Sequence, residues 1–182
     1  LSWTQGKISP NTLKGIAKLD SNTYCVVGMN GTIKRSSNGG VIWQSLESGT
    51  SRNLNGVFFA DDNYGWATGD NGVVLFTTNS GLNWNQQISG FSDRNFNSVY
   101  FLNRDTGWIV GQYGTVIYTT NGGVDWITKN SGSSIEYTNV IFADSQNGWI
   151  TGKSGKILKT SNGGTSWEIQ NSSTRNDLYS IT

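Results

Sequence analysis

Residues 77–84 read TTNSGLNW, and the pattern they set, Ser or Thr followed by x-Asn-x-Gly-x-x-Trp, occurs four times in this chain. The four motif tryptophans lie 41, 42 and 41 residues apart, and Trp3 lies 40 residues before the first of them. The positions shared by the four copies are Asn38, Gly40, Trp43, Asn79, Gly81, Trp84, Asn121, Gly123, Trp126, Asn162, Gly164 and Trp167. A fixed period of about 40 residues is the signature of a repeat architecture.

Two further markers recur in the same register. One is a Gly-Trp pair, found at residues 65–66, 107–108 and 148–149, with Tyr24-Cys25 in the corresponding place of the first copy. The other is a pair of glycines separated by two residues, found at positions 28 and 31, 69 and 72, 111 and 114, and 152 and 155. Three markers that keep one spacing are difficult to obtain by chance, so the repeat decides the architecture.

Each repeat predicts four short strands. Apolar residues alternate in Leu54–Phe59, as expected of a first strand packed on a core. Gly65–Gly69 is the second strand, and a two-residue loop bounded by glycines leads to the third, Val73–Thr77. The fourth strand begins at the motif tryptophan, after a turn of the Asn-Gly type. Four antiparallel strands in about 40 residues predict one blade of a β-propeller.

The predicted fold is therefore all-β, with helix nearly absent. We expect one propeller domain with four full four-stranded antiparallel blades over about 13–53, 54–95, 96–137 and 138–177, and part-blade strands in 1–12 and 178–182. A ring closed by these two end segments alone would lack two strands of its fifth blade. The chain is therefore expected to be part of a larger propeller, or to be completed by self-association with a second chain.

The motif tryptophans have two interpretations. A blade cannot bury both of its faces alone, so neighbouring blades must stack, and large aromatic side chains fill the space between them. On this interpretation Trp43, Trp84, Trp126 and Trp167 are largely buried between blades. The alternative makes them platforms on which sugars stack, but a ligand platform need not recur once per blade.

Composition excludes several classes of function. The 24 glycines and single proline favour short strands and tight turns, and a net charge of +1 gives no global field toward nucleic acid or membranes. Without histidine the chain has no Ser-His-Asp or Cys-His nucleophile and no histidine-ligated metal. A lone cysteine, Cys25, cannot form an internal disulfide. No apolar run approaches the ~20 residues of a membrane span, so we expect a soluble mature product or an excised fragment.

The eight-residue motif resembles the Asp-box of bacterial neuraminidase repeats. The whole repeat, with Gly-Trp in the second strand and Thr-Thr-Asn-Gly-Gly before the motif tryptophan, resembles the photosystem II assembly and stability factor family over nearly the entire chain. The Asp of the box is Asn in all four copies, which preserves a turn acceptor but weakens any role in binding a cation.

The resemblance implies a propeller that is a non-catalytic docking scaffold without a cofactor. In non-photosynthetic relatives the propeller is usually a module of exported surface proteins. The implied partner is another protein. The implied location is outside the cytoplasm of a bacterium, in the periplasm, on the cell surface or in the medium.

The competing function is a carbohydrate-binding or sialidase-like glycoside hydrolase propeller. The three glutamates are Glu47 and Glu168, on or just after fourth strands, and Glu136, in a linker. Asp20, Asp61 and Asp144 share one turn position with Asn103, so that position serves the turn. The remaining Asp70, Asp93, Asp125 and Asp177 show no spacing that pairs two carboxylates as glycoside hydrolysis requires. We therefore expect no catalytic, cofactor-binding or metal-binding residues.

The repeats differ from one another in two loops, which the resemblance places together on one face around the channel. The tips between second and third strands differ in all four copies, and the linkers into the next blade contain three of the five arginines. The predicted partner-binding rim consists of Arg52, Arg94, Arg175, Asp70, Tyr113 and Lys153. Arginine suits it because its planar fork grips carboxylates. The alternative is that these are ordinary solvated loop charges.

Overall fold

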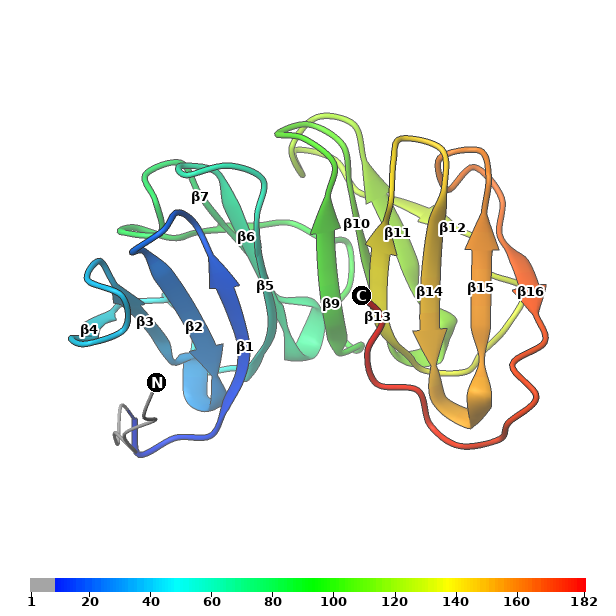
Figure 1. The fold of residues 1–182 in the computed structure, drawn as a ribbon, viewed down its shortest axis with the longest axis horizontal. Helices are drawn as coiled ribbons and strands as arrows, with labels where there is room; N and C mark the ends of the chain where they lie inside the picture. The colour runs from blue at the N-terminus through cyan, green and yellow to red at the C-terminus, as the bar shows by residue number, and fades with distance from the viewer. Residues whose placement is uncertain (1–8) are drawn as a thin grey trace.

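The computed structural model describes residues 9–182 and contains four four-stranded antiparallel sheets, each ordered along the chain (Figure 1). Blade 1 comprises β1 (Leu13–Lys18), β2 (Tyr24–Gly28), β3 (Ile33–Ser36) and β4 (Gln44–Leu46), and blade 2 comprises β5 (Leu54–Phe59), β6 (Gly65–Gly69), β7 (Val74–Thr77) and β8 (Asn85–Gln87). Blade 3 comprises β9 (Phe96–Phe101), β10 (Gly107–Gly111), β11 (Val116–Thr119) and β12 (Ile127–Lys129), and blade 4 comprises β13 (Tyr137–Phe142), β14 (Gly148–Gly152), β15 (Ile157–Thr160) and β16 (Glu168–Gln170). The predicted all-β fold with four full blades is confirmed.

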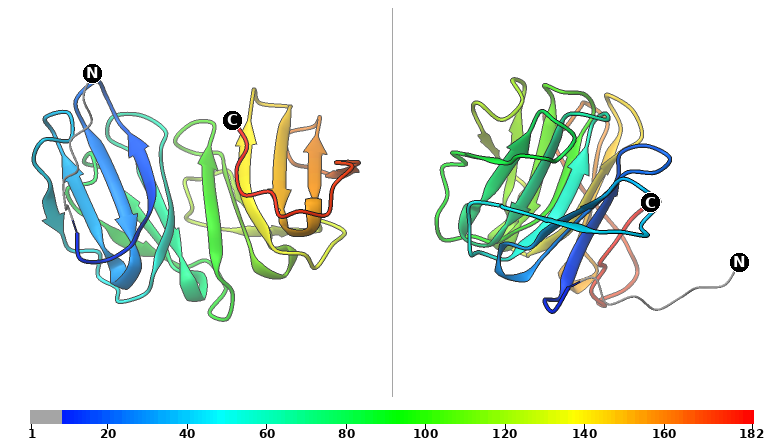
Figure 2. Two further views of the ribbon diagram at one scale, coloured as in Figure 1. Left: turned by 60° about the horizontal axis from the view of Figure 1, so that its bottom comes forward. Right: turned by 90° about the vertical axis from the view of Figure 1, so that its left-hand side faces the viewer.

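The blades follow one another in an arc. The first strands β1, β5, β9 and β13 contact one another in series, while the fourth strands β4 and β16 lie at the two outer ends of the molecule (Figures 1 and 2). Helix within residues 9–182 is limited to four three-residue 3-10 turns, each between a second and a third strand. No helix of this described part is long and apolar enough to cross a membrane.

The two predicted part-blade strands have different outcomes. Residues 1–8 of the N-terminal one, which include Trp3, lie outside the described residues, and its residues 9–12 have no strand conformation. The C-terminal one is not formed, because residues 178–182 have no strand conformation. Leu178 nevertheless lies beside blade 4, where its N–H donates to the Gly152 carbonyl at 3.1 Å and its carbonyl accepts from the Thr138 hydroxyl. In the four blades each first strand pairs with the second strand of its own blade. Residues 178–182 have no such second strand among the described residues.

The repeated eight-residue motif forms a box turn, the segment between the third and fourth strands. In blade 2 the Asn79 side-chain oxygen accepts from the Asn83 N–H at 3.0 Å and from the Thr77 hydroxyl at 3.0 Å. The Thr77 hydroxyl in turn accepts from the Gly81 N–H at 3.1 Å. The turns at Asn38, Asn121 and Asn162 repeat this pattern. An amide oxygen thus performs the turn role of the expected carboxylate.

The tryptophans of the box turns agree with the prediction in part. Trp84 is 8% exposed, but Trp43, Trp126 and Trp167 are only half-buried. Three of them meet, edge-on, the phenylalanine that ends the first strand of their own blade, at 5.8–6.0 Å between ring centroids. The prediction that the box tryptophans lie largely buried between blades is confirmed for Trp84, which shares a buried cluster with Cys25 and Ile33 of blade 1. Trp126 and Trp167 are partly exposed and pack against the clusters that join blades 2, 3 and 4.

The space between blades is filled by the tryptophans of the second strands. Trp66 of blade 2 stacks on Phe101 of blade 3 at 3.5 Å between ring centroids, and Trp108 of blade 3 stacks on Phe142 of blade 4 at 3.9 Å. Trp66 is 0% exposed and Trp108 is 1% exposed. These two stacks are the centres of the junctions between blades 2, 3 and 4.

The junction between blades 1 and 2 has no such stack. Cys25 replaces the tryptophan and is fully buried, and burial raises the pKa of its thiol to about 12. Arg35 crosses this junction instead and donates from Nε to the Ser80 carbonyl of the blade 2 box turn at 2.8 Å. A polar bridge therefore accompanies the apolar cluster that Cys25 and Ile33 form here with Phe59, Leu75 and Trp84 of blade 2.

The recurrent aspartates hold the turn between first and second strands, as the sequence predicts. One carboxylate oxygen of Asp144 accepts the N–H groups of Gln146 and Asn147, each at 2.7 Å. Asp20, Asp61 and Asn103 make the equivalent pair of bonds in the other blades. Hydrogen bonds from the Asn147 side chain, and then from these two backbone groups, lower the pKa of Asp144.

We predict that truncating a second-strand tryptophan costs more than truncating a box tryptophan. Trp108→Ala should lower the free energy of unfolding by about 3–5 kcal/mol, because it opens a cavity at a closed junction. Trp126→Ala should cost about 1–3 kcal/mol, because its ring is partly exposed and makes an edge-on contact where Trp108 makes a stack. Urea denaturation of the two variants measures both values, and equal costs would contradict this assignment of the junctions.

A second prediction concerns acid stability. The pKa of Asp144 is lower in the folded chain than in the unfolded one, so its stabilisation is present above about pH 4 and lost as the pH falls through the folded value. Asp144→Asn should keep the turn, because Asn103 makes the same two bonds in blade 3. The melting temperature of this variant should fall less than that of the parent when the pH is lowered from about 6 to below about 4. The control Asp62→Asn alters an exposed carboxylate that accepts no hydrogen bond within residues 9–182 and should leave this fall unchanged.

Candidate protein-binding surface

The tip loops and the linkers into the next blade share one face of the molecule. In blade 2 the Gly72 N–H donates to the Arg94 carbonyl of the following linker at 2.7 Å. A Cβ on Gly72 would lie 2.0 Å from the Phe91 carbonyl oxygen, so this close approach requires glycine. Equivalent approaches occur at Gly31, Gly114 and Gly155. This face, called the rim below, is the one that the resemblance implies for partner binding.

The rim is held rigid by a cap that the sequence reasoning missed. The side chains of the residues before β5, before β9 and before Leu178 each reach the tip of the preceding blade. Asn53 accepts from the Asn30 N–H at 3.0 Å, Asn95 from the Asn71 N–H at 3.1 Å, and Asp177 from the Ser154 N–H at 2.9 Å. The signal in the sequence is the amide or carboxylate at positions 53, 95, 136 and 177, directly before the first-strand segments. The caps fix tips whose own residues differ.

The three rim arginines differ in how the protein holds them. Arg94 is folded onto the protein, with its guanidinium 4.8 Å from the Phe91 ring centroid, a bond of 3.3 Å to the Thr115 hydroxyl and an ion pair with Asp93 at 3.6 Å. Its side chain is 32% exposed. Arg52 and Arg175 are exposed, and their side chains make no hydrogen bond or ion pair within residues 9–182. Two separate cations are therefore free to contact a partner.

Asp70 and Lys153 belong to polar networks within the rim. The two carboxylate oxygens of Asp70 accept from the side-chain amides of Asn53 and Asn55, each at 2.9 Å. Lys153 pairs with Glu136 at 2.8 Å, and this bond raises the pKa of Lys153. Both residues thus support the rim through internal contacts.

Tyr113 stands apart from the other predicted rim residues. It is the tip residue of blade 3, with φ of 55° and a side chain that is 64% exposed. The corresponding residues are Asn30, Asn71 and Ser154, which have short polar side chains. A bulky residue in the left-handed region is uncommon, and its ring makes no aromatic pair or hydrogen bond within the described residues. An exposed aromatic ring on a fixed loop is a typical anchor for a protein partner.

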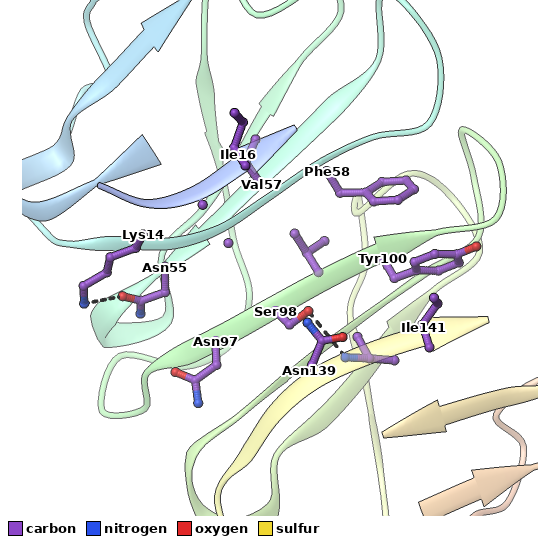
Figure 3. Close-up of a pocket in the computed structure, with 14 residues that line it drawn as sticks. Lys14, Ile16, Asn55, Val57, Phe58, Asn97, Ser98, Tyr100, Asn139 and Ile141 are labelled. Atoms are coloured by element: carbon purple, nitrogen blue, oxygen red, sulfur yellow. Dashed lines mark hydrogen bonds between the residues drawn. The ribbon is translucent and has the colours of Figure 1, made fainter. Parts of the chain in front are cut away.

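A groove of about 410 Å³ runs between the first strands of all four blades (Figure 3). Lys14, Asn55, Asn97 and Asn139 give it polar groups, and Ile16, Phe58, Tyr100 and Ile141 give it apolar walls. Ile16 is 65% exposed, and the Phe58 and Tyr100 rings lie 4.9 Å apart. Asn55 and Asn97 also bond to Asp70 and Glu136, which connects the groove to the rim. Such a surface suits an extended peptide, which offers both backbone polar groups and apolar side chains.

The groove also contains a second repeated contact that sequence reasoning missed. The Asn55 amide donates to the Phe96 carbonyl at 2.9 Å, and the Asn97 amide donates to the Tyr137 carbonyl at 2.7 Å. Each acceptor is the first residue of the next first strand. These bridges set the spacing of neighbouring first strands, and therefore the width of the groove.

Carboxylates of the described chain are not arranged for metal binding. Residues 9–182 contain no group of three or more His, Cys, Asp or Glu placed to share a metal ion. Of the carboxylates named above, Asp20, Asp61 and Asp144 hold turns, while Asp70 and Glu136 hold the rim.

The sequence profile of the family described as "Photosynthesis system II assembly factor YCF48" matches residues 37–132, which is more than half of the chain. This chain belongs to that family. No similar sequence is found among the curated proteins.

Solved structures of the family have the same fold. The structure of YCF48 bound to D1 peptide has a TM-score of 0.61 and 14% identity, with 96% of this chain and 86% of that chain covered. YCF48 from Cyanidioschyzon merolae has a TM-score of 0.58 and 14% identity, with 97% and 91% covered. The GH74 enzyme of Niastella koreensis has a TM-score of 0.62 and 20% identity, with 88% of this chain but only 24% of the enzyme covered. At these identities the structures establish the propeller-type fold of this YCF48-family chain.

We predict that Asp70 contributes to stability. Asp70→Ala removes the acceptor of two amides, Asn53 and Asn55, and should lower the free energy of unfolding by about 1–3 kcal/mol. The matched control is Asp93→Ala, which removes a carboxylate that is 74% exposed and should be nearly neutral. Thermal denaturation of the two variants measures the difference. Equal melting temperatures would contradict a stabilising role for Asp70 and leave its carboxylate available to a partner.

Proposed function

We propose that this chain is a non-catalytic scaffold that binds an extended segment of a partner protein across the rim and the groove between the first strands. The family supports this proposal, because one of its members is known in a structure bound to a peptide. The observation that carries it is that the tips and linkers have a fixed backbone but side chains that differ from blade to blade. Copied residues maintain the fold, and the residues that differ are free to recognise a partner.

The proposed contacts fall into three kinds. Arg52 and Arg175 offer unpaired guanidinium groups to carboxylates of the partner. Tyr113 offers an exposed ring, and the groove receives an apolar side chain beside Ile16 and Tyr100. Arg94, Asp70 and Lys153 position these groups, since their own charges are engaged within the protein.

A hydrolase or a carbohydrate-binding protein is the weaker alternative. The likeness to GH74 enzymes covers a quarter of their length and establishes a shared fold only. Three of the four motif tryptophans pack edge-on against a phenylalanine of their own blade, which is a structural role and does not favour a sugar platform. We also propose that the chain works outside the cytoplasm, which rests on the resemblance to exported relatives and is tested by fractionating the native host.

The proposal predicts a separation between binding and stability. The variant Arg52→Ala/Tyr113→Ala/Arg175→Ala should melt within a few degrees of the parent but lose at least about tenfold in partner binding, since charge-assisted bonds contribute about 1.5–3 kcal/mol each. The partner is first captured from the native extract on the immobilised chain, and cross-linking maps the partner segment that contacts it. Titration of each variant with a peptide of that segment then measures the affinity.

The matched control removes charge from the opposite face. Lys18→Ala deletes an exposed cation whose side chain makes no hydrogen bond or ion pair within residues 9–182, at the end of β1 that lies away from the rim. It should leave partner capture unchanged. If the control loses the partner and the rim variant keeps it, the docking site is on the opposite face and the proposal fails.

A further inference from the structure

Exposed aliphatic side chains occupy the two positions before the box tryptophan in three of the four blades. They are Val41, Ile42, Leu82 and Val124, which are 79%, 69%, 45% and 75% exposed. The box turn does not require them, because blade 4 forms the same turn with Thr165 and Ser166 at these positions. These aliphatic groups are therefore used neither by the turn nor by the core, and they gather on one surface.

That surface is the face of the molecule opposite the rim. In every blade the residue after the motif asparagine donates its N–H to a carbonyl of the turn between the first and second strands, at 2.8–3.0 Å. Both kinds of turn lie at the strand ends away from the 3-10 turns of the rim (Figure 1). We call this surface the box face. It consists of the box turns 37–43, 78–84, 120–126 and 161–167 and the turns 19–23, 60–64, 102–106 and 143–147.

The box face is acidic. Its eight turns contain six of the nine aspartates of the chain, namely Asp20, Asp61, Asp62, Asp105, Asp125 and Asp144. They contain one cation, Arg104, which pairs with Asp61 and lies 4.2 Å from the Tyr64 ring centroid. The other five aspartates form no ion pair within residues 9–182. The whole chain has a net charge of +1, so an excess of cations lies outside the box face.

Two cations border this face without neutralising it. Lys18 ends β1 and is exposed, and Arg35 is engaged by the Ser80 carbonyl of the blade 2 box turn. Both belong to blade 1. The box face of blades 2 and 3 therefore keeps a net negative charge.

Acidic and aliphatic groups lie side by side where blades 2 and 3 meet. Asp125 directly follows Val124 in the chain, and the Asp105 carbonyl accepts the Gly122 N–H of the same box turn at 2.9 Å. The pair between Arg104 and Asp61 joins the turns of the two blades across their junction. Unpaired carboxylates beside exposed aliphatic groups are complementary to a segment that carries cations beside aliphatic side chains.

We propose that the box face docks a second protein partner through a basic amphipathic segment, independently of the rim and the groove. Lysines or arginines of the segment pair with Asp62, Asp105 and Asp125, and its aliphatic side chains cover Leu82 and Val124. The negative charge of the face opposes nucleic acid and anionic lipid headgroups. The carboxylates of the described chain are also not grouped to share a metal ion.

The test uses a defined probe, an amphipathic peptide of about 18 residues with leucine on one helical face and lysine on the other. Fluorescence anisotropy measures its affinity for the full chain. One control peptide replaces every lysine by glutamate, and another replaces every leucine by serine. The probe should bind at least about tenfold more tightly than either control, because the charged and the apolar contacts both contribute. Added salt should weaken this binding, since exposed charge pairs are screened.

Charge variants locate the bound probe. Asp62→Asn/Asp105→Asn removes two exposed carboxylates whose oxygens accept no hydrogen bond within residues 9–182, and should weaken binding about three- to tenfold. The matched control Glu47→Gln/Asp93→Asn removes the same charge from exposed residues of the linkers and should leave binding unchanged. All four substituted side chains are exposed, so both variants should melt with the parent.

Aliphatic variants test the apolar half of the site. Leu82→Ser/Val124→Ser should weaken probe binding at least about fivefold, because both side chains lose their apolar contact with the probe. The matched control Ile88→Ser removes a side chain that is 86% exposed in the linker after β8, and should have no effect.

Three results would overturn the proposal. If the linker control weakens binding as much as Asp62→Asn/Asp105→Asn, the probe is attracted by carboxylates in general. If the serine peptide binds as tightly as the probe, charge alone is sufficient and the aliphatic groups have no role. If Arg52→Ala/Tyr113→Ala/Arg175→Ala loses the probe, the probe occupies the rim. The expected result is that this rim variant binds the probe at least as tightly as the parent does.

Discussion

The structure depends on one repeated contact, the stacking of a second-strand tryptophan on the phenylalanine that ends the next first strand. A four-stranded sheet has two apolar faces, and water is excluded from both only when sheets stack. The stacks at Trp66 and Trp108 close two junctions at 3.5 and 3.9 Å, and the glycines of the facing box turns allow the indoles to approach this closely. Stability is thus a property of neighbouring pairs of blades, and the box turns serve it by presenting glycine to the preceding blade.

Recognition is separated from this stabilising system. The caps formed by Asn53, Asn95 and Asp177 hold the tip loops, and the bridges from Asn55 and Asn97 set the spacing of the first strands. Because backbone geometry is fixed from these positions, the exposed side chains of the tips and linkers can differ without loss of fold. A fixed backbone also lowers the conformational entropy lost when a partner binds.

The sequence predicts the blades well and the contacts between them poorly. The repeat period, the turn residues and the alternation of apolar residues can all be read within single segments of the sequence, so they are sufficient to predict four blades. Stacking partners are not local: the register alone does not show that Trp66 meets Phe101, and the box tryptophans were the more conspicuous repeat. The same holds on the rim. Asp70 and Arg175 both read as loop charges, but only the structure shows that two asparagines engage Asp70 while Arg175 stays free.

The junctions differ in chemistry. Between blades 1 and 2 the stack is replaced by Cys25 and by the bond from Arg35 to the Ser80 carbonyl. Other residues keep this junction apolar, because Phe59, Leu75 and Trp84 of blade 2 form one buried cluster with Cys25 and Ile33 of blade 1. The groove is lined by the first strands of all four blades, so a partner that fills it contacts every junction of the described chain. Binding at the groove and packing of the blades therefore stabilise each other.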